Sequence, residues 1–130
     1  MAIKCYIAGC NIDECKALRD LLVEKGYEIT AKWLDEPFRR TLTYSVENRR
    51  HIANMDRDDV LRSDLLIHFA TDRYIPGGKF VEVGIAIGAN IPVINVGYQE
   101  NMLMWCDSVE TVATQEDAIL LLERRILEGL

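Results

Sequence analysis

The stretch GGKFVEVGIAIG, residues 77–88, carries a single carboxylate, Glu82, among small and apolar residues. If a helix begins near Lys79, Glu82 lies in or just beyond its first turn, where free backbone N–H groups and the helix dipole favour an ionised carboxylate. The same position suits a glutamate that serves only the helix. Small neighbours, however, let another group approach, and an accessible anionic carboxylate can act as a nucleophile. Spacing alone leaves both interpretations open.

A second group of carboxylates lies in the segment HIANMDRDDVLRSDLLI, residues 51–67. If this segment is a helix that leads into a strand, Asp56 and Asp59 share one helical face. Paired carboxylates, one anionic and one protonated, can cleave a glycosidic bond, because one attacks or stabilises the anomeric carbon and the other protonates the leaving group. The candidates are Asp56, Asp58, Asp59 and Asp64. Most of them are expected to be solvated, and one is expected to face Glu82.

Two residue types with possible chemistry lie in or beside expected strands and loops. His68 falls inside an apolar strand, which favours a hydrogen-bonded core histidine over a catalytic one. Trp33 and Trp105 lie beside expected loops, where each can either stack on a planar base or pack on the core. The histidine is therefore not a leading candidate, whereas the two tryptophans stay open.

Several well-known kinds of binding site are excluded because the sequence lacks their motifs. Gly9 ends the first expected strand, but AGCNIDE lacks the GxGxxG spacing of a dinucleotide site, and neither GxxxxGK[ST] nor the acidic pair of a phosphoacceptor domain is present. The four cysteines lack the CxxC spacing of a zinc site and are expected to be reduced thiols. We therefore expect neither a metal nor a cofactor.

Strand-like and helix-like segments alternate along the chain, which predicts an α/β fold. We expect a single Rossmann-like (flavodoxin-like) domain over residues 1–130, with a parallel sheet of about five strands flanked by helices. Ligands of such sheets bind beyond the carboxyl ends of the strands, here near residues 9–13, 71–78 and 97–101. The expected strands are residues 3–8, 27–33, 65–70, 91–97 and 109–113; the expected helices are 13–25, 46–62, 79–89 and 115–128, with a loop over 34–45.

Composition limits the partners of this chain of 130 residues. Its formal net charge is −6 and its arginine pairs are scattered, which argues against binding to nucleic acid backbones. No apolar run approaches the roughly 18–20 residues that cross a bilayer, and the first residues do not form a signal peptide. We therefore expect a cytoplasmic protein that binds neither nucleic acid nor membrane.

Four motifs follow one another along the chain: KCYIAG at the first strand, MDRDDVLRSDLLI with its D-x₇-D spacing, GGKFVEVGIAIGANIPVI, and ENMLMW. In this order they resemble the nucleoside 2-deoxyribosyltransferase-like family, which includes deoxyribosyltransferases and related nucleotide N-glycoside hydrolases. The resemblance covers about residues 3–125.

The resemblance assigns roles to the residues of these motifs. Glu82 falls on the nucleophile and Asp56 on the position that handles protons at the nucleobase. Asn101 matches an asparagine that one subunit contributes to the sugar site of its neighbour, which implies a homo-oligomer, a dimer or higher. With Trp33 as a stacking candidate and Gly78 in the glycine-rich turn, the residues expected to bind substrate are Tyr6, Gly9, Trp33, Gly78 and Asn101.

The predicted function is cleavage or transfer at the N-glycosidic bond of a nucleoside or nucleotide, with a 2′-deoxy sugar preferred. Such an enzyme of nucleotide metabolism is a transferase or a hydrolase. Six residues before Glu82 stands Pro76, where transferases of the family tend to have aspartate and monophosphate hydrolases serine. Lys79 or an arginine of residues 34–50 is then the candidate contact for a phosphate. The alternative function is a non-catalytic protein of the same fold that binds a nucleotide or a nucleotide-derived ligand.

Overall fold

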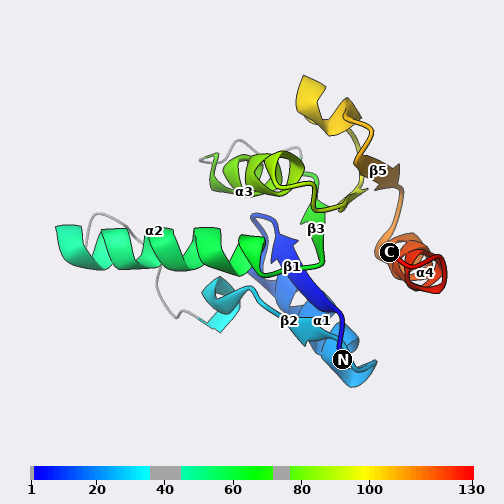
Figure 1. The fold of residues 1–130 in the computed structure, drawn as a ribbon, viewed down its shortest axis with the longest axis horizontal. Coiled ribbons are helices and arrows are strands. Elements are labelled where there is room, and N and C mark those ends of the chain that lie inside the picture. The colour runs from blue at the N-terminus through cyan, green and yellow to red at the C-terminus, as the bar shows by residue number, and fades with distance from the viewer. Residues whose placement is uncertain (1, 36–44, 72–76) are drawn as a thin grey trace.

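Five parallel strands form one sheet in the order β2-β1-β3-β4-β5. The computed structural model of the chain describes residues 2–35, 45–71 and 77–130 (Figure 1). The arrangement confirms the predicted α/β, Rossmann-like class with a parallel sheet flanked by helices. The strands are β1 Lys4–Ala8, β2 Glu28–Ile29, β3 Leu65–Phe69, β4 Val93–Val96 and β5 Val109–Val112.

The helices begin and end close to the predicted positions. Three of them start at a residue whose side chain accepts a hydrogen bond from the backbone N–H three residues later, as helix N-caps commonly do: Asn11, Ser45 and Thr114. The helices are α1 Ile12–Glu24, α2 Val46–Leu61, α3 Gly78–Gly88 and α4 Gln115–Leu127, with the 3₁₀ helices η1 Lys32–Asp35 and η3 Met102–Trp105.

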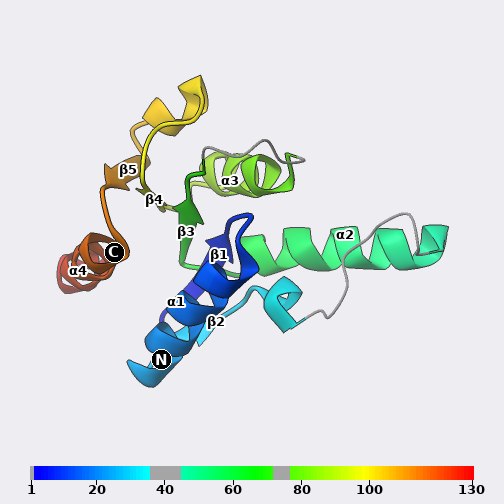
Figure 2. The same ribbon diagram turned by 180° about the vertical axis from the view of Figure 1, so that it is seen from behind.

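The direction of the chain across the sheet reverses between β1 and β3. From β1 the chain moves to one side to form β2, and from β3 it moves to the other side to form β4. Because crossovers between parallel strands are right-handed, α1 and α3 lie on opposite faces of the sheet (Figures 1 and 2). The long α2 packs against α3, while Lys25 at the end of α1 forms an ion pair with Glu123 of α4 at 3.8 Å.

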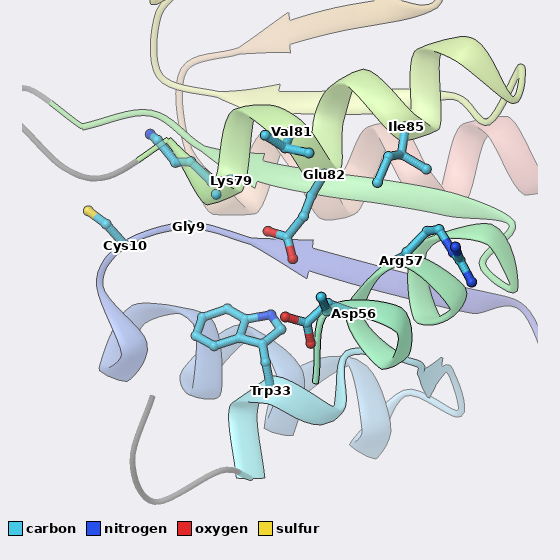
Figure 3. A pocket seen from close by; sticks show the side chains of 11 residues that line it. Gly9, Cys10, Trp33, Asp56, Arg57, Lys79, Val81, Glu82 and Ile85 are labelled. Atoms are coloured by element: carbon cyan, nitrogen blue, oxygen red, sulfur yellow. The ribbon is translucent and has the colours of Figure 1, made fainter. Parts of the chain in front are cut away.

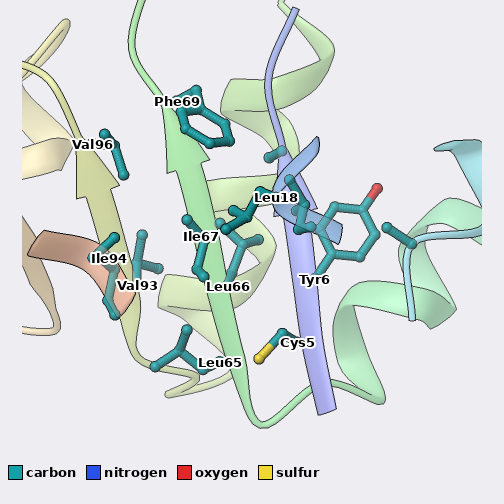
Figure 4. Packing of buried hydrophobic residues seen from close by; sticks show 14 of the residues in the cluster. Cys5, Tyr6, Leu18, Leu65, Leu66, Ile67, Phe69, Val93, Ile94 and Val96 are labelled. Carbon is teal, nitrogen blue, oxygen red and sulfur yellow. The ribbon is translucent and has the colours of Figure 1, made fainter. Parts of the chain in front are cut away.

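The core lies on both faces of the central strands. All five residues of β3 are buried, as the apolar composition of this strand predicts. Tyr6 of β1 pairs with Leu66 of β3 in the sheet, and leucine and isoleucine side chains from the helices and strands surround them (Figure 4). This rigid centre fixes the ends of β1 and β3.

The predicted second strand, residues 27–33, is wrong beyond Ile29. Hydrogen bonds to other elements turn the chain away from the sheet: the backbone N–H of Lys32 donates to Asp59 Oδ2 at 3.2 Å, and Trp33 Nε1 donates to the carbonyl of Ile7 at 2.9 Å. Residues 32–35 therefore form η1. Of the predicted loop over 34–45, the first two residues belong to η1, and residues 36–44 lie outside the described residues.

We expect Gly97→Ala to destabilise the fold by about 2–4 kcal/mol, from a strained backbone and an overpacked contact together. Gly97 has a φ of +117°, and an added Cβ would lie 2.8 Å from the Cβ of Ala70. Urea denaturation measures the loss. The matched control is Gly26→Ala, where φ is +96° but no atom lies within 4 Å of the added Cβ, so only the smaller backbone cost is expected. Equal losses in the two variants would contradict the steric argument.

Candidate active site

A pocket of about 760 Å³ opens beyond the carboxyl end of β1, between η1, α2 and the start of α3 (Figure 3). Its position agrees with the rule that ligands of parallel sheets bind beyond the carboxyl ends of the strands, near the reversal of strand order. The volume falls within the range of small-molecule sites. Its lining residues are Gly9, Cys10, Trp33, Ala53, Asp56, Arg57, Gly78, Lys79, Val81, Glu82 and Ile85.

Glu82 extends from α3 into this pocket (Figure 3). Because α3 begins at Gly78, Glu82 lies just beyond the first turn, where the influence of the helix dipole fades. A more specific contact comes from Tyr6 of β1, whose hydroxyl donates a hydrogen bond to Glu82 Oε2. Hydrogen bonds donated to a carboxylate favour its anionic form and fix its orientation. The contact therefore fixes the orientation of the Glu82 carboxylate in the pocket.

Tyr6 is placed behind Glu82 rather than in the pocket wall. Its side chain is 0% exposed, and it is not among the lining residues. The structure thus connects Tyr6 to the site through the carboxylate of Glu82. Gly9, by contrast, lines the pocket directly, and a Cβ at this position would lie 2.9 Å from Cys15 Sγ, so this turn is built for glycine.

Asp56 is the carboxylate that α2 presents to the pocket. Its side chain and that of Glu82 extend from two different helices toward the same space (Figure 3). The other three acidic candidates do not line the pocket: Asp58 Oδ1 accepts from Arg57 at 3.0 Å, the buried Asp59 Oδ1 from Arg62 at 2.9 Å, and Asp64 Oδ2 from the backbone N–H of Lys4 at 2.9 Å. Of the four aspartates, Asp56 is therefore the one that shares the pocket with Glu82.

Trp33 forms part of the pocket wall on the side of η1. Its indole N–H donates to the carbonyl of Ile7, which fixes the ring beside the pocket (Figure 3). Helix α3 adds the aliphatic side chains of Val81 and Ile85 to the lining. A fixed aromatic ring with apolar neighbours suits a planar, uncharged group such as a nucleobase.

Sequence reasoning missed several lining residues that helical spacing could have found. Ala53 and Arg57 are one helical turn apart and flank Asp56 on α2, while Val81 and Ile85 are one turn apart and flank Glu82 on α3. Cys10 directly follows Gly9. Once Asp56 and Glu82 are accepted as pocket residues, these neighbours follow from the period of the helix.

Asn101 lies away from this pocket. It is the exposed N-cap of η3, and its Oδ1 accepts from the backbone N–H of Leu103 at 3.0 Å. Trp105, the other stacking candidate, lies in the same 3₁₀ helix and is exposed. No residue of 97–101 is among the pocket-lining residues that the structure describes. Whether Asn101 completes the site of a second copy stays a prediction.

Two further side chains are settled by their surroundings. His68 is a core histidine as expected: it is fully buried, its Nδ1 lies 2.7 Å from Asn95 Oδ1, and burial lowers its pKa to about 4, so it is neutral at pH 7. Lys79 does not offer its charge to the pocket, since its ammonium group lies 2.6 Å from Glu100 Oε1. The interpretation of Lys79 as a phosphate contact is therefore not supported by its geometry.

The described part of the chain contains no group of three or more metal-binding side chains placed to hold a metal ion. The four cysteines are free thiols, and burial raises the pKa of Cys5 and of Cys15 to about 12, so both stay protonated. Across residues 2–35, 45–71 and 77–130, no helix has both the length and the apolar character to cross a membrane.

The fold is shared with several solved structures. A 2-deoxyribosyltransferase from Bacillus psychrosaccharolyticus superposes with a TM-score of 0.68 at 20% identity, covering 88% of this chain and 89% of that one. A CMP N-glycosidase, BcmB, from Clostridium botulinum gives 0.59 at 19% identity, covering 95% and 98%. A conserved protein from Enterococcus faecalis V583 gives 0.68 at 17% identity, covering 96% and 99%.

No family model and no curated protein matches the chain by sequence. The relation therefore lies in the fold, and at that level the resemblance to nucleoside 2-deoxyribosyltransferase-like proteins is confirmed. These proteins span almost the same length as this chain. The roles of individual residues rest on the geometry of the pocket.

Proposed function

We propose that the protein cleaves or transfers the N-glycosidic bond of a nucleoside or nucleotide, with a 2′-deoxy sugar preferred, through a covalent intermediate on Glu82. The observation that carries this proposal is the pair of carboxylates, Glu82 and Asp56, in one pocket beside Trp33. Two fold neighbours, a 2-deoxyribosyltransferase and a CMP N-glycosidase, make the same class of substrate a reasonable choice. All of residues 1–130 would form this one catalytic domain.

The proposed reaction has two steps. Glu82 attacks the anomeric carbon and forms an ester, the bond to the base nitrogen breaks, and Asp56 gives its proton to the departing base. In the second step Asp56, now a carboxylate, takes a proton from water that attacks the anomeric carbon, and the ester bond to Glu82 breaks. If a second base attacks instead of water, the same step yields a new nucleoside. One pair of residues thus accounts for hydrolysis and for transfer.

A 2′-deoxy sugar suits this pathway, because the cationic character that develops at the anomeric carbon is less destabilised without the 2′-hydroxyl group. Trp33 would hold the base, which leaves the sugar between the base and the start of α3. Tyr6 would keep Glu82 oriented before attack, through the hydrogen bond that it donates to Oε2.

The proposal is tested by product analysis. The protein is mixed with deoxynucleosides, ribonucleosides and their monophosphates, with and without a second free base. We expect release of free base from at least one deoxy substrate, and a new nucleoside when transfer competes with hydrolysis. No base release from any of them, at protein concentrations matching the substrate, would reject the enzyme. If a nucleotide then raises the melting temperature of both the parent and Glu82→Gln, the chain is a ligand-binding protein instead.

A homo-oligomer in which Asn101 enters the neighbouring site predicts complementation between two inactive variants. Glu82→Gln lacks the nucleophile, and Asn101→Asp keeps the acceptor for the Leu103 N–H but lacks the amide donor. After the two are unfolded together and refolded as an equal mixture, half of randomly formed dimers are mixed, and each contains one intact site. We expect about a quarter of the parent activity. No recovery, or full activity of a monomer, would contradict the shared site.

A further inference from the structure

Lys79 is a buried lysine in the first turn of α3, three residues before Glu82. Its side chain is 2% exposed. The ammonium group donates to Glu100 Oε1 at 2.6 Å and to the carbonyl of Phe69 at 3.0 Å, and it lies 4.9 Å from the centre of the Phe80 ring. A buried charge without partners is strongly disfavoured, so these contacts determine where the lysine lies.

Glu100 connects the lysine to two strand ends. Its side chain is 10% exposed and belongs to the segment that follows β4. The same oxygen, Oε1, also accepts from the backbone N–H of Thr71 at 3.2 Å, and Thr71 follows β3. The Lys79–Glu100 ion pair therefore fastens the start of α3 to the carboxyl ends of both β3 and β4.

A buried ion pair is a weak source of stability, because the loss of hydration of both charges offsets much of their attraction. The pair nevertheless restricts the relative positions of the two side chains strongly, because each charge must stay close to the other. The first turn of α3 cannot shift along its axis or rotate without breaking this pair. Since Glu82 lies one turn further along the same rigid helix, its carboxylate shifts with that turn.

We propose that the Lys79–Glu100 ion pair positions α3 so that Glu82 reaches the anomeric carbon of the substrate. This inference rests on the proposed function. Lys79 is a positioning residue that acts through the helix, and Glu100 is its anchor. Although Lys79 is among the residues that line the pocket, its ammonium group is paired with Glu100, which is not.

The test compares Lys79→Met with the parent enzyme on a deoxynucleoside and on its monophosphate. Because small displacements of a reacting group cost about a hundredfold in rate, we expect kcat to fall by about that factor. Steady-state KM values of both substrates should stay close to those of the parent. The control is Lys25→Met, which removes a lysine that is paired on the protein surface and should leave both constants unchanged.

The inference is overturned if Lys79→Met keeps the parent kcat, or if it only raises KM for the monophosphate, which would make Lys79 a phosphate contact. Should Lys79→Met fail to fold because Glu100 is left unpaired, the double variant Lys79→Met/Glu100→Gln buries no lone charge. We expect this variant to fold and to show the same loss of kcat.

A crystal structure of the double variant separates this inference from the proposed function. In the parent, Tyr6 donates to Glu82. We expect that contact to be lost or changed in the double variant, because the helix start is no longer fixed. An unchanged contact overturns the positioning role. If the parent cleaves no glycosidic bond, the proposed function fails, yet the same comparison still decides whether the ion pair positions Glu82.

Discussion

Glu82→Gln is expected to lower kcat/KM for base release by at least about a thousandfold, as the loss of a nucleophile commonly does. Glutamine has nearly the shape of glutamate and can still accept from the Tyr6 hydroxyl through its amide oxygen. The variant therefore removes the charge and the attacking oxygen while the pocket keeps its volume. Because the fold is preserved, the loss would report on chemistry rather than on stability.

Intact-protein mass spectrometry after mixing with a deoxynucleoside gives the direct measurement. The parent should gain the mass of one deoxyribosyl group, located on Glu82 by peptide mapping, and Glu82→Gln should gain nothing. Glu47→Gln is a suitable control, since Glu47 is an exposed glutamate in the first turn of α2, away from the pocket-lining residues. A sugar adduct that persists in Glu82→Gln would show that another group is the nucleophile.

Asp56→Asn is expected to lower the rate by about a hundredfold for ordinary nucleobases, the usual contribution of a positioned acid. An asparagine cannot donate the proton that the departing base requires. The effect should be much smaller on a nitrophenyl 2-deoxyriboside, because nitrophenolate leaves as a stable anion and needs no proton. Single-turnover rates on the two substrates measure this difference, since they report the step in which the bond to the leaving group breaks.

The control for this prediction is Asp58→Asn, which changes an exposed aspartate on the same helix that pairs with Arg57. It should leave both rates near those of the parent. Equal losses on both substrates in Asp56→Asn would mean that Asp56 binds or orients the sugar rather than protonating the base. That result would reassign the acid while leaving the nucleophile untouched.

Local sequence patterns predicted the helices and strands whose bounds depend mainly on the local sequence. The apolar run over residues 65–70 predicted β3, and the helical patterns over 13–25 and 115–128 predicted α1 and α4, each with bounds within one residue of the structure. The second strand failed because YEITAKW has the composition of a strand, while Lys32 and Trp33 find hydrogen-bond partners on α2 and β1. Tertiary contacts of this kind have no signature in a short window of sequence.

The candidate site likewise has some features that the sequence predicts and others that it does not. Glu82 and Asp56 could be proposed from residue type, spacing and family resemblance, and the pocket indeed contains both. The contact between Tyr6 and Glu82 could not, because it depends on how α3 lies over β1. The direction of the Lys79 side chain could not be predicted either, because it depends on Glu100 in the segment that follows β4. Charge and spacing identify the candidate reactive groups, but only the packing of the elements determines which side chain each group contacts.

The reversal of strand order between β1 and β3 also affects how the site assembles during folding. These two strands pair although residues such as Lys4 and Asp64 are 60 positions apart in the sequence. Closing so long a loop costs chain entropy before the contacts compensate for it, which makes such pairing a slow step. Trp33 comes before β3 in the sequence and Glu82 comes after it. Neither of these two parts of the chain can therefore form the pocket alone. Catalytic competence would therefore return on refolding only when the central pair of strands has formed.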